Sequence, residues 1–208
     1  MRSVGRPARL SLPQILDAVE AIGVDRFTVK GVADHLRVRD STVYNYIVSR
    51  EQLRADTCAR ALARVPLQFD EITPWVDYLI EVNRGLREAA SNLPGLADYY
   101  LHGPYAHETL SVFDTQIAEV RRRLPEADDS YAFVLASHAT TTTLSFFAAP
   151  GMEENAAIRV LTETLPALHR ALGGHAPAGI DWPALRTSLA AQASRSAGAH
   201  PLQGRRSE

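Results

Sequence analysis

Four polar side chains within seven consecutive positions have the chemistry to read nucleic-acid bases. They are Arg39, Ser41, Thr42 and Asn45. Serine, threonine and asparagine hydrogen-bond to base edges, and arginine contacts guanine or phosphate. Their spacing places them on one face of a short helix whose other face carries Val43, Tyr44 and Ile47 inward. We predict base contacts from the three uncharged side chains, with Arg39 left open between a guanine and a phosphate.

A preceding helix is needed to position this polar face. Its apolar residues recur at helical spacing and share one buried face: Val29, Val32, Ala33 and Leu36. We expect Thr28 to cap this helix, and Asp40 or Ser41 to cap the next one after a break at 37–39. Two short helices that cross at roughly a right angle, with a polar outer face on the second, can enter a DNA major groove.

Positive and polar residues around this motif fit contacts with the DNA backbone. We expect Lys30 and Tyr46 to contact phosphates, and Arg50 to add positive charge beside the groove. Residues 1–12 form a basic arm that is either a disordered tail or a segment that reaches phosphates or the minor groove. Both readings hold if the arm becomes ordered on DNA.

The segment from Ile15 to Leu53 resembles the DNA-binding domain of the tetracycline-repressor (TetR) family of transcriptional regulators. The matching pieces are ILDAVEAIG (15–23), FTVKGVADHLRV (27–38) and TVYNYIVSREQL (42–53). Four positions depart from the family's pattern, where Gly, Ser, Phe and Lys are common: Arg37, Arg39, Ile47 and Arg50. Arg37 puts the tight turn in question, because a residue other than glycine is strained at positive φ.

Charge is divided unevenly along the 208 residues, whose net charge is −2. Residues 1–60 hold ten Lys and Arg and seven Asp and Glu (net +3), whereas residues 61–208 hold twelve and seventeen (net −5). The basic end therefore carries the two-helix motif. The single cysteine, Cys58, and the lack of a long apolar run lead us to expect a cytoplasmic protein with no membrane span.

The remainder of the chain reads as longer helices separated by proline and glycine, with no alternation typical of strands. We expect helices at about 74–91, 95–102, 105–124, 128–148, 154–172 and 182–196. The predicted fold is all-α, with an N-terminal three-helix helix-turn-helix domain and a C-terminal helical domain for ligand binding and dimerisation. The expected divisions are 1–48 (arm and DNA-binding domain), 49–66 (connecting helix, started by a Ser49–Gln52 capping box), 67–197 (helical domain) and 198–208 (disordered tail).

Two helices have patterns that suggest pairing between copies. The segment 131–149 contains no charged residue, so it has no obvious solvent face. The next helix has a leucine-rich stripe at nearly heptad spacing: Ile158, Leu161, Leu165, Leu168 and Leu172. We predict a homodimer through the helices at about 128–148 and 154–172, as the family resemblance also implies; an ordinary intrachain core is the alternative.

The resemblance further implies that the C-terminal helices sense a small molecule. Candidate ligand-binding residues are the aromatic and polar side chains that could line an apolar pocket: Tyr99, Tyr100, His102, Tyr105, Phe113, Gln116, Phe133, His138 and Phe147. His107 lies among these residues in the sequence. Aromatic residues at helical spacing also fit core packing. For each of these residues, the alternative is therefore a place in the core.

The prediction is a ligand-responsive DNA-binding regulator, released as a repressor from an inverted-repeat operator by a small apolar or aromatic effector. A helix-turn-helix protein without a ligand is the first alternative, and an all-helical enzyme is the second. The sequence contains no glycine-rich phosphate loop, no nucleophile elbow and no Glu-x-x-His or His-x-x-x-His metal motif. We therefore expect no catalysis, no cofactor and no metal.

Overall fold

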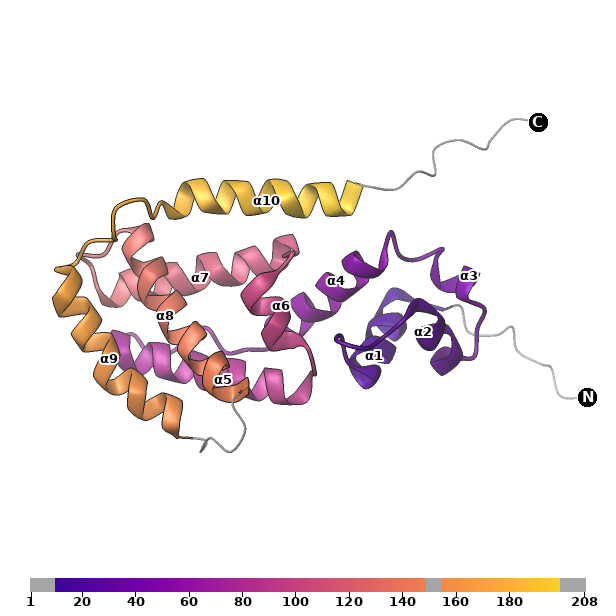
Figure 1. Ribbon diagram of the computed structural model, residues 1–208, viewed down its shortest axis with the longest axis horizontal. Coiled ribbons are helices and arrows are strands. Elements are labelled where there is room, and N and C mark those ends of the chain that lie inside the picture. The colour runs from indigo at the N-terminus through magenta and orange to yellow at the C-terminus, as the bar shows by residue number, and fades with distance from the viewer. Residues whose placement is uncertain (1–9, 149–154, 199–208) are drawn as a thin grey trace, which may run out of the picture.

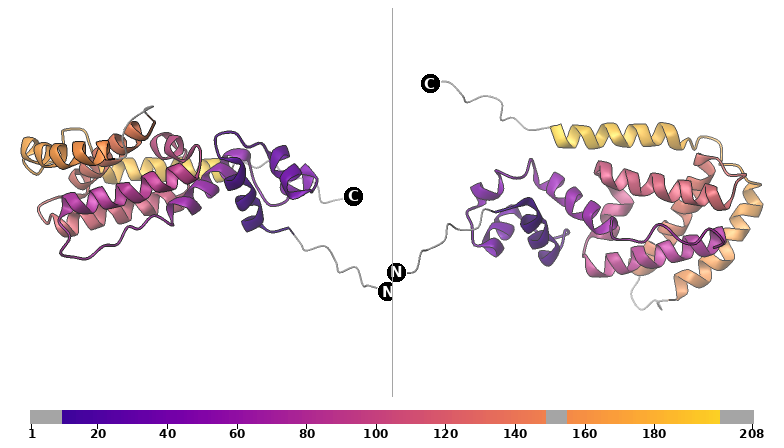
Figure 2. Two further views of the ribbon diagram at one scale, coloured as in Figure 1. Left: turned by 90° about the horizontal axis from the view of Figure 1, so that it is seen from below. Right: turned by 180° about the vertical axis from the view of Figure 1, so that it is seen from behind.

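The computed structural model describes residues 10–148 and 155–198. Over these ranges the chain forms ten helices and no strand, which confirms the all-α fold class. Figure 1 shows an elongated molecule with α1–α3 at one end, α5–α9 at the other, α4 between them and α10 along one side. Both views in Figure 2 keep this division. The predictions for the arm before Leu10 and for the tail after residue 198 lie outside the described residues.

Two of the four N-terminal helices, α2 and α4, begin at the side-chain caps that the sequence predicts. The four helices are α1 (Leu12–Ile22), α2 (Val29–Leu36), α3 (Asp40–Val43) and α4 (Arg50–Leu62). The Thr28 hydroxyl accepts a hydrogen bond from the Gly31 N–H at 2.9 Å, and the Ser49 hydroxyl accepts one from the Gln52 N–H at 3.0 Å. The start of α3 differs from expectation, because Arg39 occupies the N-cap position and caps no N–H with its side chain.

The turn between α2 and α3 keeps its tight geometry without a glycine. Arg37 takes the left-handed conformation, with φ 56° and ψ 40°. Its N–H bonds to Asp34 O at 3.1 Å, and the Val38 N–H bonds to Ala33 O at 3.0 Å, so the end of α2 is closed by backbone hydrogen bonds. The turn therefore closes tightly with an arginine in a conformation that favours glycine.

The C-terminal domain is built from six helices. They are α5 (Trp75–Asn92), α6 (Leu96–His102), α7 (His107–Arg123), α8 (Asp129–Ala148), α9 (Ala156–Leu172) and α10 (Trp182–Gly198). Helices α5, α7, α8 and α9 enclose one apolar cluster in which Tyr78, Leu135 and Leu165 are fully buried. This cluster is the core of the C-terminal domain.

Over the described residues, no helix is both long and apolar enough to cross a membrane.

The leucine-rich stripe of α9 packs inside its own chain. Leu161 and Leu165 belong to the buried cluster, and Ile158, Leu168 and Leu172 pack against it. The stripe therefore matches the intrachain alternative at Leu161 and Leu165, whereas Ile158, Leu168 and Leu172 are half-buried. The reason is that α9 closes the core over α8 and α5.

The two domains share a second apolar cluster, which joins α1–α4 to the end of α5, to α6 and to Leu144 of α8. A backbone hydrogen bond of 3.0 Å runs from Val24 N–H to Pro94 O. At Gly95, φ is 91°, and a Cβ would come within 2.7 Å of the Asp25 backbone nitrogen. The loop before α6 is thus in direct backbone contact with the N-terminal domain, between Val24 and Pro94.

Candidate functional site

The polar face predicted around α3 is exposed at the end of the molecule. Val43 and Ile47 are buried at 0% and 7% exposure and hold this segment onto α1 and α2. The side chains above them point to solvent, with Thr42 half-buried and the rest exposed: Arg39, Ser41, Asn45 and Tyr46. Lys30 on α2 is exposed as well. The arrangement has the spacing and the accessibility that contacts with base edges and phosphates require.

Tyr44 corrects the prediction that it is a core residue, because 54% of it is exposed. The regular α-helix ends at Val43, and the next hydrogen bonds join Asn45 N–H to Thr42 O and Tyr46 N–H to Val43 O. These bonds span three residues and wind the chain more tightly than an α-helix does. Tyr44 itself keeps an α-helical hydrogen bond from its N–H to Asp40 O at 3.1 Å, and its side chain lies on the same exposed surface as its polar neighbours.

Arg50 is anchored within the domain. Its Nε donates a hydrogen bond to Phe27 O at 3.1 Å, and its guanidinium lies 4.8 Å from the centre of the Phe27 ring. This cation–π contact ties the start of α4 to the segment before α2. Arg50 therefore supplies the expected positive charge near α3. The contacts with Phe27, which is fully buried, fix the orientation of its guanidinium.

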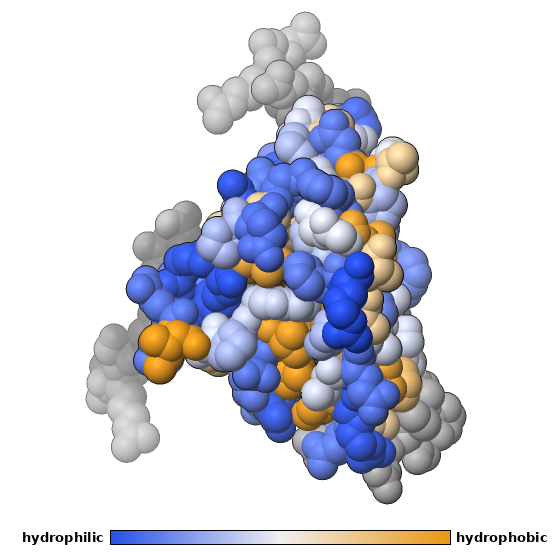
Figure 3. Space-filling model, turned by 90° about the vertical axis from the view of Figure 1, so that its left-hand side faces the viewer, coloured by the Kyte–Doolittle hydropathy of each residue, from blue (hydrophilic) through white to orange (hydrophobic). Residues whose placement is uncertain are grey.

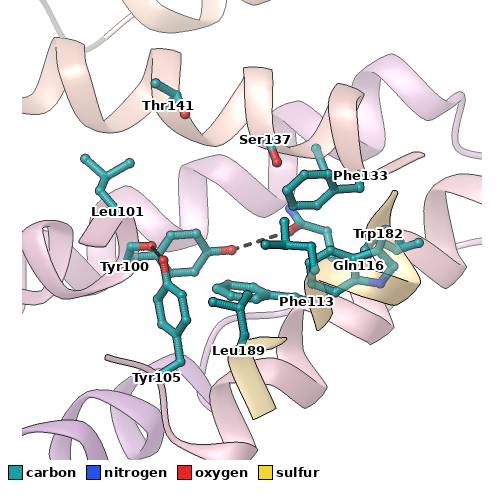
Figure 4. Close-up of a pocket in the computed structure, with 13 residues that line it drawn as sticks. Tyr100, Leu101, Tyr105, Phe113, Gln116, Phe133, Ser137, Thr141, Trp182 and Leu189 are labelled. Atoms are coloured by element: carbon teal, nitrogen blue, oxygen red, sulfur yellow. Dashed lines mark hydrogen bonds between the residues drawn. The ribbon is translucent and has the colours of Figure 1, made fainter. Parts of the chain in front are cut away.

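A cavity of about 280 Å³ lies between α6, α7, α8 and α10. It is lined by Tyr100, Leu101, Tyr105, Phe113, Gln116, Ile117, Phe133, Ala136, Ser137, Thr141, Trp182, Leu185 and Leu189. Figure 4 shows the aromatic side chains around this space, with Tyr100 and Gln116 joined across it. Mostly apolar walls with a few converging polar groups are typical of small-molecule sites.

Aromatic contacts give the cavity its shape. Phe113 makes edge-to-face contacts with Tyr100 and Tyr105, each at 5.1 Å between ring centres. On the other side Phe133 stacks on Trp182 at 4.7 Å and 21°. These contacts hold the rings in fixed orientations, so the walls are largely pre-formed.

One polar pair lies among these rings. The Tyr100 hydroxyl donates to Gln116 Oε1 at 3.4 Å, whereas Gln116 Nε2 is buried and has no hydrogen-bond partner among the described residues. Burial raises the pKa values of Tyr100 and Tyr105, so both phenols are neutral at physiological pH. The described residues contain no cluster of His, Cys, Asp or Glu arranged to hold a metal ion.

Five of the nine predicted ligand-binding residues line the cavity: Tyr100, Tyr105, Phe113, Gln116 and Phe133. The other four lie elsewhere. Tyr99 is fully buried and shares a hydrogen bond of 2.8 Å with Thr109, and exposed His102 contacts Asp98 on its own helix. His138 points to α9, where it shares a hydrogen bond of 2.9 Å with Thr164, and Phe147 packs on the cluster shared with the N-terminal domain.

Helix α10 supplies cavity residues that the sequence analysis missed: Trp182, Leu185 and Leu189. Their spacing of three and four residues indicates an apolar helix face, but spacing cannot tell which part of the core that face covers. Two polar contacts hold α10 over the cavity. Arg186 forms an ion pair of 2.9 Å with Asp114 of α7, and the Trp182 N–H donates to Ser130 Oγ at 3.0 Å.

No protein-family model and no curated protein matches the chain. Solved structures do. The TetR family protein ActR from Streptomyces coelicolor in complex with actinorhodin is 18% identical, with a TM-score of 0.56 over 92% of this chain and 99% of that chain. TetR from Acinetobacter baumannii AYE, solved as a variant in complex with minocycline, is 13% identical, with a TM-score of 0.56 over 96% and 99%.

The transcriptional regulator SCO7222, a TetR from Streptomyces coelicolor, is 19% identical, with a TM-score of 0.51 over 89% of this chain and 87% of that chain. These likenesses extend over about nine-tenths of the chain and concern its fold. The protein has the fold of TetR-family transcriptional regulators, in agreement with the resemblance of residues 15–53.

Proposed function

We propose that the protein is a DNA-binding transcriptional regulator of the TetR type. The observation that carries this proposal is the exposed polar face around α3, held over buried Val43 and Ile47 at the tip of the molecule. Base contacts come from Ser41, Thr42 and Asn45. Arg39 contacts a guanine or a phosphate, and the flanking phosphates are met by Lys30, Tyr46 and Arg50.

The regulator acts as a homodimer on an inverted repeat. Two copies related by a two-fold axis bring their α3 segments to half-sites about 34–36 Å apart. The proposed interface is formed by α8 and the face of α9 that lies beside its buried stripe. That face carries Val160, Thr164, Ala167 and Ala171 at helical spacing, none of them charged. Figure 3 looks onto the α9 end of the molecule, where hydrophobic residues form strips between hydrophilic ones.

The cavity binds a small apolar or aromatic effector, and α6 carries its effect to the DNA-binding domain. Tyr100 and Leu101 of α6 line the cavity. On the same helix, Asp98 forms an ion pair with Arg54 of α4. A ligand that prefers one position of α6 also changes the position of the two α3 segments. The coupling free energy between ligand binding and DNA binding is then about 1–3 kcal/mol. In this proposal the ligand lowers the affinity for DNA and so relieves repression.

A regulator without an effector is the second candidate, and the cavity argues against it. A concave, mostly apolar cavity that contains a buried amide unpaired among the described residues is typical of a small-molecule site. Catalysis has no support at this site, because none of the lining residues is an acid, a histidine or a cysteine.

Selection of bound fragments from a random DNA library tests the DNA-binding proposal. An inverted repeat with half-sites about one helical turn apart is the expected product. With the selected operator, Asn45→Ala is expected to reduce affinity by about 1–3 kcal/mol and to leave weak non-specific binding intact. Ser188→Ala, at an exposed position of α10 away from the DNA, is the matched control. Equal operator affinity in both variants would remove the assignment of the reading face.

A further inference from the structure

We propose that the effector is a flat, uncharged aromatic molecule with a hydrogen-bond acceptor on one edge, and that Gln116 donates to this acceptor. The inference rests on the proposed function, because it names the chemical class that the cavity between α6, α7, α8 and α10 takes. It follows from three properties of the described cavity: its charge, its shape and one unpaired amide.

The cavity has no group that could balance a charged ligand. None of its thirteen lining residues is Asp, Glu, Lys, Arg or His. The two phenols, Tyr100 and Tyr105, are kept neutral by burial, which raises both pKa values. Burying an ion without a partner is strongly unfavourable, so an ionised carboxylate, phosphate or amine is rejected.

The aromatic side chains favour a flat ligand. Phe133 and Trp182 stack nearly parallel, with 21° between their planes, and present flat rings beside the cavity. Tyr105 stands with its ring at 83° to that of Phe113. A planar aromatic ligand can therefore offer its face to one wall and its edge to the other, which are the geometries that aromatic rings prefer. The volume of about 280 Å³ limits the ligand to a compact molecule.

Gln116 sets the polar requirement. It is only 3% exposed, and its Oε1 is engaged by the Tyr100 hydroxyl at 3.4 Å. This contact orients the carboxamide so that Nε2 remains a donor without a partner among the described residues. Figure 4 shows the pair in the middle of the aromatic lining. A ligand that brings a carbonyl or ether oxygen to Nε2 completes the hydrogen bonding, whereas a hydrocarbon of the same shape leaves the donor unsatisfied.

Two tricyclic probes of nearly the same shape test this requirement. 9-Fluorenone has one carbonyl oxygen, and fluorene has none. Binding is followed by quenching of Trp182 emission in a Trp75→Phe background, because Trp182 lines the cavity and Trp75 does not. We expect the full-length protein to bind fluorenone about tenfold more tightly than fluorene. A fluorenone that carries a carboxylate is expected to bind at least tenfold more weakly than fluorenone.

Substitution of Gln116 identifies the donor. Gln116→Leu keeps nearly the same volume without the amide, and it is expected to bring the two affinities within about twofold of each other. Gln116→Met is the second variant, in case the leucine perturbs folding, and circular dichroism checks both. A preference for fluorenone that persists in a folded variant would overturn the role of Gln116. Equal binding of both probes by the parent protein would overturn the acceptor requirement.

The outcomes separate this inference from the proposed function. If the parent protein binds the selected operator and both probes equally, only the ligand class fails. If it binds the operator and neither probe, the ligand class and the effector site fail together, and DNA binding stands. If no operator is selected, the regulatory proposal fails regardless of the probes, whose affinities still decide the ligand class.

Discussion

Arg54 Nη2 and Asp98 Oδ2 lie 2.6 Å apart and join α4 to α6. Arg54 also places its guanidinium 5.8 Å from the centre of the Tyr99 ring, next to Tyr100 of the cavity wall. The hydrogen bond from Arg54 holds the pKa of the Asp98 carboxyl below its usual range. The pair therefore stays ionised at neutral pH, and it links the connecting helix to the helix that borders the cavity.

Asp98→Asn is expected to weaken the coupling between effector and DNA more than it weakens folding. The Asp98 side chain is 64% exposed, so loss of the ion pair changes the free energy of unfolding by about 1 kcal/mol or less. The ligand-induced change in operator affinity should fall, while affinities for operator alone and ligand alone change little. Binding isotherms with and without ligand measure this. Asp77→Asn, at an exposed position of α5, is the control, and an equal loss of coupling there would contradict the role of Asp98.

The helices and five of the cavity-lining residues were predictable from the sequence. Caps at Thr28 and Ser49 and the prolines and glycines between helices fix the boundaries to within a few residues of those observed. The polar face around α3 follows from helical spacing, and the resemblance of residues 15–53 extends to the fold. These features depend on neighbours in sequence, which is why they could be recognised there.

The parts that were missed depend on contacts between distant segments. Tyr44 is 54% exposed because no part of the chain that the structure describes covers its side of α3, which residue types alone do not encode. Trp182 lines the cavity because α10 is held on α7 by the Arg186–Asp114 pair, 72 positions apart in sequence. His138 and Phe147 belong to the right helix but to its other faces. A helix without charged residues gives no periodic signal to tell its faces apart.

Gly95→Ala is expected to disturb the junction between the domains. A Cβ at this position would lie 2.7 Å from the Asp25 backbone nitrogen and 2.9 Å from a Val24 methyl, and φ is 91°. The backbone atom cannot yield as a flexible side chain would, so we expect a loss of unfolding free energy of roughly 1–3 kcal/mol. Urea denaturation measures it.

Gly179→Ala separates strain from contact. Its φ of 89° is nearly the same, but no atom lies within 4 Å of the added Cβ. This variant should therefore show the conformational cost alone and leave operator affinity unchanged. The larger loss in Gly95→Ala, with weaker operator binding, would establish the backbone contact between the domains. Equal losses in both variants would argue that the contact has no energetic weight.

Arg37→Gly is expected to raise the stability of the DNA-binding domain. Arg37 is the one residue other than glycine with positive φ among the described residues, at 56°. Relief of left-handed strain contributes about 1 kcal/mol, and the greater freedom of glycine in the unfolded chain offsets part of this gain. Arg39→Gly removes the same charge at φ −77°, where glycine offers no relief, so it should lower stability. Urea denaturation measures the free energy of unfolding of both variants. If the lost charge were the cause, the two variants would shift in the same direction, whereas relief of strain stabilises only Arg37→Gly.

The thiol of Cys58 is expected to be unreactive in the folded protein. Cys58 is fully buried on α4, and burial raises the pKa of its thiol to about 12. The thiolate is the nucleophile, so labelling with a disulfide reagent at pH 8 should require opening of the structure. The rate should increase with urea in parallel with unfolding. Rapid labelling without denaturant would contradict the burial of this side chain.

The same thiol sets a dependence of stability on high pH. The folded pKa lies above the ordinary value of 9.0, so the folded state binds the proton more tightly than the unfolded state does. Its contribution to stability is therefore complete below pH 9.0 and is lost progressively as the pH rises toward about 12. Cys58→Ala has no thiol to titrate. The stability of the parent protein should fall more steeply than that of the variant between pH 8.5 and pH 10.5, at about 1.4 kcal/mol per pH unit at most. Parallel pH profiles in urea denaturation would show that Cys58 loses its proton as easily in the folded protein as in the unfolded chain.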